Sequence, residues 1–242
     1  MQLTIENWHG WMPTVASAEQ WQRWSEGAVL SSDDSRIDLS SIPPMLRRRL
    51  SPMGRACASV LLPLIDSDNE SGLANTPIVF ASRHGEAQRT QLMLEDIADC
   101  ELISPTAFSL SVHNAISGIL SINKNITANI SAIAASGSEV MAALFEAAGL
   151  LGQENCSKVH CVIVDNPLPD RYQRYCQQPQ YPFALAFSVS TAQRGCKIEL
   201  KIAKCQTDDE LQPLQFIRLL LGQKKSIRLT QGRAQWQLSR VC

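Results

Sequence analysis

Three features that often settle the class of a protein are missing from this sequence. No apolar run approaches the roughly 18 residues needed to cross a bilayer. The start, MQLTIENWHGW, lacks the basic and apolar regions of a signal peptide. Charge of neither sign dominates, because the chain has 22 basic and 23 acidic side chains. We therefore expect no membrane span and no general affinity for nucleic acid or anionic membranes.

Disulfide and metal frameworks are not indicated either. Eight cysteines are present without a Cys-x-x-Cys pair, and several lie inside apolar runs, as small buried side chains do. The four histidines are scattered and lack the spacing of metal ligands. We expect reduced thiols, a cytoplasmic location, no metal and no cofactor.

The sequence does contain a globular composition with alternating strand and helix patterns. Its 242 residues, 45% apolar and 19% charged, allow a substantial core, and we expect residues 1–242 to form a single domain. Strands are expected over residues 3–11, 76–82, 126–133, 159–165, 184–190, 197–203 and 235–241. Helices are expected to start near Ser51-Pro52 and to cover residues 85–100, 104–120, 136–151 and 211–221. Strands that are apolar on both faces and alternate with helices predict a layered α/β fold.

The N-terminal segment is rich in tryptophan. Trp8, Trp11, Trp21 and Trp24 all fall within the first 24 residues. A ligand-stacking role is one interpretation, and amphipathic anchors that hold the N-terminus to the body are the other. We favour anchors.

The segment Asn125–Gly152 reads NITANISAIAASGSEVMAALFEAAGLLG. It is an apolar strand followed by a tight turn of small residues and an Ala/Leu-rich helix. This arrangement presents a catalytic Cys or Ser at a helix N-terminus, where backbone N–H groups lower the pKa of a thiol. The turn of this chain has Ala134 and Ala135, and a methyl group cannot attack a thioester.

Three segments in order, RRRLSPMGRACA, SPTAFSLSVHNAISGILSI and the strand, turn and helix after them, form a recognisable series. The series resembles the N-terminal half of a β-ketoacyl synthase, and more closely the short ketosynthase-like chain-length factors of aryl polyene biosynthesis. The resemblance covers roughly residues 3–202, is strongest over residues 43–165, and leaves the role of residues 203–242 open. It implies a truncated thiolase-like fold, a layered α-β-α arrangement around a mostly buried mixed sheet.

The departures from the family pattern bear on function. Family ketosynthases use a cysteine at the turn and two histidines from their C-terminal half to condense acyl chains. The resemblance puts Ala134 at the cysteine position, and no histidine follows His160 in this chain. Both histidine motifs and the glycine-rich C-terminal loop are thus absent. We predict no catalysis by the chain alone.

The resemblance also implies a partner and an interface. Thiolase-type domains pair through the strand before the turn, so we expect a heterodimer with a catalytic β-ketoacyl synthase, and acyl carrier protein recruited through that complex. The predicted interface residues are Ile126, Thr127, Ala128, Asn129, Ile130, Ser131, Ile133, His113 and Asn114. The predicted pocket or gate residues are Thr106, Phe108, Ser109 and Val112. Phe108, the bulkiest apolar side chain of its segment, is the predicted gate on polyene length.

Other interpretations stay open at this point. The chain could be a homodimeric scaffold that binds acyl carrier protein without controlling chain length. It could also be an acyltransferase that uses an off-motif cysteine, Cys57 or Cys161. Arg47-Arg48-Arg49 is either a solvated face or a docking site for an acidic carrier protein or a partner subunit.

The serines of the turn allow two interpretations. Ser136 or Ser138 could replace the nucleophile with His113 or His160 as base. More simply, Ser136 caps the following helix and Glu139 completes a capping box. His160 and Cys161 are adjacent on a strand and should point to opposite faces, which rules them out as a pair.

Overall fold

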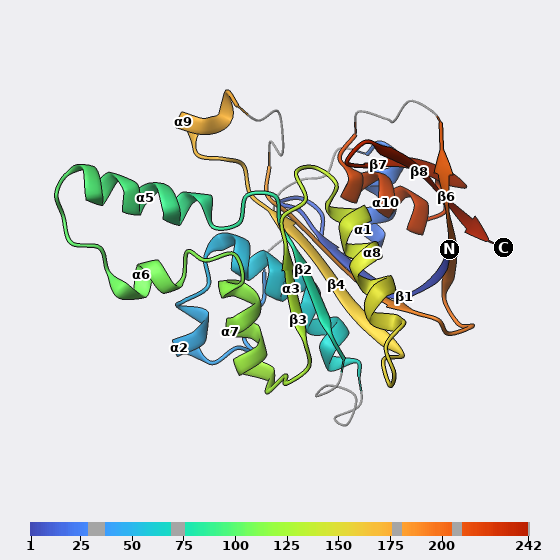
Figure 1. Ribbon diagram of the computed structural model, residues 1–242, viewed down its shortest axis with the longest axis horizontal. Helices are drawn as coiled ribbons and strands as arrows, with labels where there is room; N and C mark the ends of the chain where they lie inside the picture. The colour runs from blue at the N-terminus through green and yellow to red at the C-terminus, as the bar shows by residue number, and fades with distance from the viewer. Residues whose placement is uncertain (29–36, 69–75, 176–180, 205–209, 242) are drawn as a thin grey trace.

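The structure, a computed structural model, describes residues 1–28, 37–68, 76–175, 181–204 and 210–241. Within these residues eight strands form one sheet in the order β3-β2-β4-β5-β1-β6-β8-β7 (Figure 1). The strands are β1 Gln2–Trp11, β2 Ile78–Ala81, β3 Ile130–Ile133, β4 Lys158–Asp165, β5 Phe183–Ser190, β6 Cys196–Ala203, β7 Ser226–Gln231 and β8 Ala234–Val241. The helices are α1 Ala18–Ser25, α2 Pro44–Arg47, α3 Pro52–Asp66, α5 Ala87–Ala98, α6 Pro105–Ser109, α7 Ala115–Lys124, α8 Glu139–Leu151, α9 Asp170–Gln173 and α10 Gln212–Leu220.

The direction of the strands divides the sheet into two parts. β3, β2 and β4 are parallel to one another, while every further pair from β4 to β7 is antiparallel. The carboxyl ends of the three parallel strands therefore meet at one edge of the sheet. In open α/β sheets, sites usually form at such an edge.

Helices cover both faces of the sheet, and strand β4 shows how the sequence encodes this. Cys161 and Ile163 belong to the core cluster under α8 and α10, whereas Val162 and Val164 belong to the cluster under α3 and α7. Side chains alternate between faces along a strand, so a continuous apolar run is required where both faces are covered. The predicted layered α-β-α arrangement is confirmed.

The N-terminal tryptophans are anchors rather than a ligand platform. Trp21 is buried and donates its indole N–H to the carbonyl of Gly10, 2.9 Å away. The ring lies so close to Gly10 that a β-carbon there would come within 2.8 Å of it, so glycine is required at this position. Trp8 of β1 packs edge-on against Trp21 and so fixes α1 to the sheet, and Trp24 of α1 packs edge-on against Trp21 as well.

The C-terminal residues that the structure describes complete the same fold. Leu214, Phe216, Ile217 and Leu219 of α10 are buried in the core cluster that contains α8. Phe145 of α8 packs edge-on against Trp236 of β8, with ring centroids 4.9 Å apart. Strands β6, β8 and β7 extend the main sheet. In the described part of the chain, no helix is long and apolar enough to cross a membrane.

Two predicted elements are wrong in extent. The helix expected over residues 104–120 is two helices, α6 and α7, separated at residues 110–114. The strand expected over residues 126–133 is only β3. Asn125 adopts a left-handed conformation and Ile126 donates its N–H to Ser121, so this part of the chain ends α7 instead of pairing with β2.

Candidate functional site

The candidate site lies at the carboxyl edge of the three parallel strands. Ser82 follows β2, Ala134 follows β3, and Asp165 ends β4. Parallel pairing in register places these three ends side by side. The site is thus built from segments far apart in the sequence.

The turn between β3 and α8 has the predicted position but a different cap. Ser136 and Gly137 have positive φ, 48° and 95°, and Ser138 is the N-cap of α8 without a side-chain hydrogen bond. The predicted capping box at Ser136 is therefore wrong, because Ser136 is part of the left-handed turn. Glu139 instead accepts the N–H of Gly137 at 2.6 Å. Ala134 is exposed at the end of the strand.

A buried carboxylate holds the neighbouring loop in place. Asp165 accepts hydrogen bonds from the Ser82 hydroxyl at 2.8 Å and from the backbone N–H groups of Arg83 and His84 at 2.9–3.2 Å. The Ser82 hydroxyl in turn accepts the N–H of Gly85 at 2.9 Å. These donors all come from the loop after β2, so Asp165 positions that loop.

The electrostatics of Asp165 are unusual. Burial raises the pKa of Asp165 to about 7, and the negative charge of Glu139 adds to the rise. The hydrogen bonds from Arg83, Ser82 and His84 favour the charged form and limit the increase. Two buried carboxylates therefore lie near each other beside the turn. The sequence signal for this feature is an acid at the end of the apolar run Cys161–Val164.

His113 joins the loop after β2 to strand β3. Its Nε2 lies 2.9 Å from the carbonyl oxygen of Ile133, the last residue of β3. Its ring packs edge-on against Phe80 of β2 and lies directly over Gly85. His113 was predicted at the interface, and the structure places it next to the edge strand.

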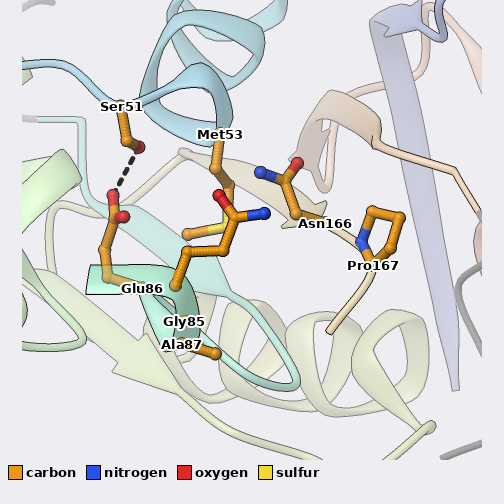
Figure 2. A pocket seen from close by; sticks show the side chains of 8 residues that line it. Ser51, Met53, Gly85, Glu86, Ala87, Asn166 and Pro167 are labelled. Carbon is orange, nitrogen blue, oxygen red and sulfur yellow. Dashed lines mark hydrogen bonds between the residues drawn. The ribbon is translucent and has the colours of Figure 1, made fainter. Parts of the chain in front are cut away.

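A small pocket lies between the start of α3 and the loops after β2 and β4 (Figure 2). It is lined by Ser51, Glu86 and Asn166 among others, and has a volume of about 10 Å³. Ser51 donates its hydroxyl to buried Glu86 at 2.5 Å, and Arg89 forms an ion pair with the same carboxylate. Burial raises the pKa of Glu86. The pocket has room for about one water molecule and not for an acyl chain.

The predicted interface and gate residues belong to different elements. Residues Ile130–Ile133 form an edge strand whose pairing, among the described residues, is with β2 alone. Thr127, Ala128 and Asn129 precede it and line an open hollow of about 410 Å³. Ile126 packs against the core, and the side chain of Asn114 is exposed. The gate residues Thr106, Phe108, Ser109 and Val112 are exposed on and after α6, remote from β3 in the sequence.

His160 has two polar partners that the sequence did not suggest. Its Nδ1 lies 2.9 Å from the Ser188 hydroxyl, and its Nε2 lies 2.9 Å from Asp68. Asp68 also pairs with Lys158 at 3.0 Å. Ser188 and His160 are 3% and 2% exposed, so this Ser-His-Asp arrangement is closed to substrate and serves the fold. His160 and Cys161 do face opposite sides of the sheet, as predicted.

The off-motif cysteines do not form a reactive site. Cys57 and Cys161 are fully buried, and burial raises the pKa of each thiol. A reactive thiol needs access and a lowered pKa. Cys176, Cys205 and Cys242 lie outside the described residues. Among the residues that are described, no group of three His, Cys, Asp or Glu side chains is placed to hold a metal ion.

Comparison with known proteins finds a matching family model and a structure that is similar over the whole chain. The family model described as β-ketoacyl synthase, N-terminal domain, matches residues 21–239. A chain from the structure of a ketosynthase (ApeO) in complex with its chain length factor (ApeC) from Xenorhabdus doucetiae is similar throughout. It is 29% identical with a TM-score of 0.82, over 99% of this chain and 100% of that chain. No curated protein matches the chain.

More distant structures share the fold. The ishigamide ketosynthase/chain length factor is 14% identical with a TM-score of 0.61, over 84% of this chain and 68% of that chain. The structure AntDE:AntF, a type II PKS acyl-carrier protein in complex with its ketosynthase bound to the hexaketide, is 13% identical with a TM-score of 0.59. The similarity covers 84% of this chain and 69% of that chain. The architecture is therefore the thiolase-like ketosynthase fold in truncated form.

Proposed function

The chain belongs to the β-ketoacyl synthase family, and from that premise we propose that it is a chain length factor. In this role it pairs with a catalytic ketosynthase and shapes the acyl pocket during aryl polyene or related type II synthesis. The observation that carries the proposal is Ala134, which directly follows β3 and which the resemblance puts at the cysteine position of the family pattern.

The residues around the turn support a non-catalytic role. Ser136 and Ser138 would need a general base to act as nucleophiles. His113 contacts Ile133 and Gly85, and His160 is buried against Asp68 and Ser188. No histidine follows His160 in the sequence. We expect a chain with this pattern to act through another subunit.

The two edges of the sheet differ in a way that supports pairing through β3. Exposed sheet edges are usually protected by charged residues or proline, because unpaired backbone groups invite association. β7 carries Arg228 and follows Lys224-Lys225, whereas β3 reads Ile-Ser-Ala-Ile with no charge and no proline. An unprotected edge is expected where a partner strand adds to the sheet.

The similar chain from Xenorhabdus doucetiae comes from a ketosynthase in complex with its chain length factor. The similarity covers 99% of this chain and 100% of that chain. We extend the pairing to this chain and place its partner on β3. Acyl carrier protein would then reach the complex through the catalytic subunit.

The proposed gate residues require an acyl pocket that belongs to the partner subunit. Phe108 is 61% exposed on α6, and the pocket at the carboxyl edge is far too small for a polyene. An exposed phenyl ring can limit chain length only when it enters a cavity of another subunit. Thr106, Ser109 and Val112 lie in the same exposed segment and would line the same cavity.

The test is co-expression with the proposed partner, a catalytic ketosynthase, followed by size-exclusion chromatography with light scattering. We expect a 1:1 heterodimer for the wild-type chain. Ala132→Lys on β3 should abolish it, while Ser226→Lys on β7, a matched change at the opposite edge, should not. A homodimer that does not bind the ketosynthase would overturn the proposal and favour the scaffold that binds acyl carrier protein instead.

A further inference from the structure

The three strands at one end of the sheet, β6, β8 and β7, are strongly basic. Together with the turns that flank them, residues 193–204 and 224–241, they have nine basic side chains and one acidic side chain, Glu199. The basic residues are Arg194, Lys197, Lys201, Lys204, Lys224, Lys225, Arg228, Arg233 and Arg240. Between the two segments, Glu210 forms an ion pair with Arg218, and Asp208 and Asp209 lie outside the described residues.

This concentration of charge differs from the average of the chain. The whole chain has 22 basic and 23 acidic side chains, so the rest of it has 13 basic and 22 acidic ones. The near-neutral total, from which we expected no general affinity for anionic membranes, is thus the sum of two oppositely charged parts. A molecule of this kind is oriented by a charged surface even when its net charge is small.

The strands direct part of the positive charge to one side of the sheet. Leu200 of β6 and Leu229 of β7 are buried in the core cluster that contains α8 and α10. Side chains alternate between the two sides of a strand, so Lys201 and Arg228 lie on the opposite, outer side, where both are exposed. Both are paired with Gln237 of β8 in the register of the sheet, which puts the three residues in one row. Figure 1 shows these strands at the end of the molecule opposite α5 and α6.

Protection of a sheet edge does not account for all of these cations. Lysine and arginine on an edge strand prevent unwanted pairing, which explains Arg228 of β7. Lys197 and Lys201, however, lie on β6, an interior strand between β1 and β8. Lys201 forms an ion pair with Glu199 at 2.7 Å, and Glu199 is the one acidic residue of the two segments. The excess of positive charge therefore has no counterpart within these strands and turns.

The chemistry of the outer side favours a flat anionic surface over a folded partner. A protein interface has an apolar or aromatic centre, whereas the central row here is Lys201, Gln237 and Arg228. Single-stranded nucleic acid needs exposed aromatic rings to stack on, and Trp236, the one aromatic residue of the three strands, packs against the core cluster. An anionic bilayer surface needs neither, because each lysine or arginine that lies near it adds to the attraction.

Two exposed apolar side chains lie beside the cations. Ile202 follows Lys201 and is 73% exposed, and Val241 is 38% exposed opposite Lys197 in the pairing of β6 with β8. Peripheral binding to lipid combines electrostatic attraction with shallow burial of apolar side chains. The same end of the sheet offers both.

We propose that the outer side of β6, β8 and β7 is a binding surface for anionic membranes. The attachment is peripheral and reversible, because it depends on charge that salt screens. β7 and β3 are the opposite edges of the sheet. Binding of lipid at this surface therefore does not compete for the edge strand where we place the ketosynthase, and it does not depend on the proposed function.

The experiment is sedimentation of the full chain with lipid vesicles. One set contains about one third phosphatidylglycerol in phosphatidylethanolamine, and the other contains uncharged phosphatidylcholine alone. We expect the chain to sediment with the anionic vesicles only. It should be released at about 1 M salt, where the screening length falls to about 3 Å.

A pair of substitutions tests whether this surface is responsible. Lys201→Gln combined with Arg228→Gln should lower the binding constant for anionic vesicles at least about tenfold, because two cations of the outer side are lost. Arg171→Gln combined with Arg174→Gln removes the same charge from α9, where both arginines are exposed, and should bind like the wild type. All variants should keep the wild-type melting temperature, since the changed side chains are exposed.

The other outcomes each overturn a defined part of the proposal. Equal sedimentation with both kinds of vesicle, or with neither, would overturn membrane binding. Equal weakening by the α9 variant would show that total charge, and not this surface, is responsible. Binding to acyl carrier protein or to duplex DNA that depends on Lys201 and Arg228, without binding to vesicles, would overturn the choice of an anionic membrane. A chain that binds vesicles but not the ketosynthase would overturn the proposed function and leave this proposal intact.

Discussion

A β-carbon built on Gly85 would lie 2.8 Å from Nδ1 of His113, closer than real carbon atoms pack. Gly85 also has a φ of 55°, in the left-handed region. The two residues lie on either side of residues 87–112, the segment that contains α5 and α6, and the same imidazole binds the carbonyl of Ile133. Their contact therefore fixes both ends of this segment to the end of the edge strand β3.

This contact predicts a coupled pair of substitutions. Gly85→Ala should destabilise the fold by about 1–2 kcal/mol from the left-handed conformation alone, with a further cost from the clash with His113. In a His113→Ala background the clash disappears, so the cost of Gly85→Ala should be smaller. Urea denaturation of the four proteins measures this difference, and additive costs would show that the two side chains do not interact. Asn114→Ala, at an exposed neighbour, serves as the control.

The pKa of Asp165 predicts a pH dependence of stability. Because the folded-state pKa, about 7, lies above the ordinary value of 3.8 for an aspartate, the folded protein holds the proton more tightly than the unfolded chain. The contribution of Asp165 to the free energy of unfolding is complete below about pH 4. It is lost as the pH rises to about 7, by at most about 1.4 kcal/mol per pH unit. Asp165→Asn should abolish this loss, so the wild-type and variant curves should diverge across that window.

The control for this prediction is Glu139→Gln. It keeps an acceptor for the N–H of Gly137 and removes the charge that raises the pKa of Asp165. The upper limit of the window should therefore move to lower pH. Parallel curves for wild type and Asp165→Asn between pH 4 and 7 would contradict the assignment.

Much of this fold could be predicted because buried strands and helices leave strong patterns. VHCVIVD became β4 and the Ser51-Pro52 start became the beginning of α3. β7 was missed, although Ile227 and Leu229 alternate with polar residues and are buried. The break between α6 and α7 could not be predicted from the neighbouring residues. It allows His113 to contact Ile133, which is 20 positions away in the sequence. The polar network of Asp165 was hidden for the same reason, since its partners are about 80 residues distant.

Asp68 predicts the opposite pH dependence. Burial alone would raise its pKa, but hydrogen bonds and charges from His160 and Lys158 outweigh burial and lower the pKa to about 2. Its contribution is thus present above about pH 4 and is lost as the pH falls toward 2. Asp68→Asn should lower the free energy of unfolding by about 1.5–3 kcal/mol at pH 7, since hydrogen bonds to charged groups are lost. It should also remove the part of the pH dependence that Asp68 causes at acidic pH. Asp66→Asn, at an exposed pair with Lys124, should change stability by less than about 1 kcal/mol.

The proposed absence of catalysis predicts the result of restoring a thiol. Ala134→Cys should not extend an acyl chain when the protein is mixed alone with acyl and malonyl carrier protein, because no histidine follows His160 to assist decarboxylation. Mass spectrometry of the carrier-bound products measures this. Ala135→Cys, one position along, is the control for thiol placement, and the active ketosynthase complex shows that the assay works. Extended product from Ala134→Cys alone would contradict the prediction, because it would show that the chain holds the other groups needed for condensation.

The gate proposal makes the most specific prediction, for Phe108 in the assembled complex. Phe108→Ala removes a bulky ring that is 61% exposed on α6, and it should lengthen or broaden the polyene products measured by chromatography with mass detection. Leu102→Ala is the matched control, because Leu102 is 96% exposed between α5 and α6 but lies outside residues 104–112. Its product length should stay unchanged. The affinity for the ketosynthase is measured in parallel, so that a weakened complex is not mistaken for an altered gate. If Phe108→Ala leaves product length unchanged in an intact complex, the ring does not enter the acyl pocket, and the limit on length has to be set by the ketosynthase itself.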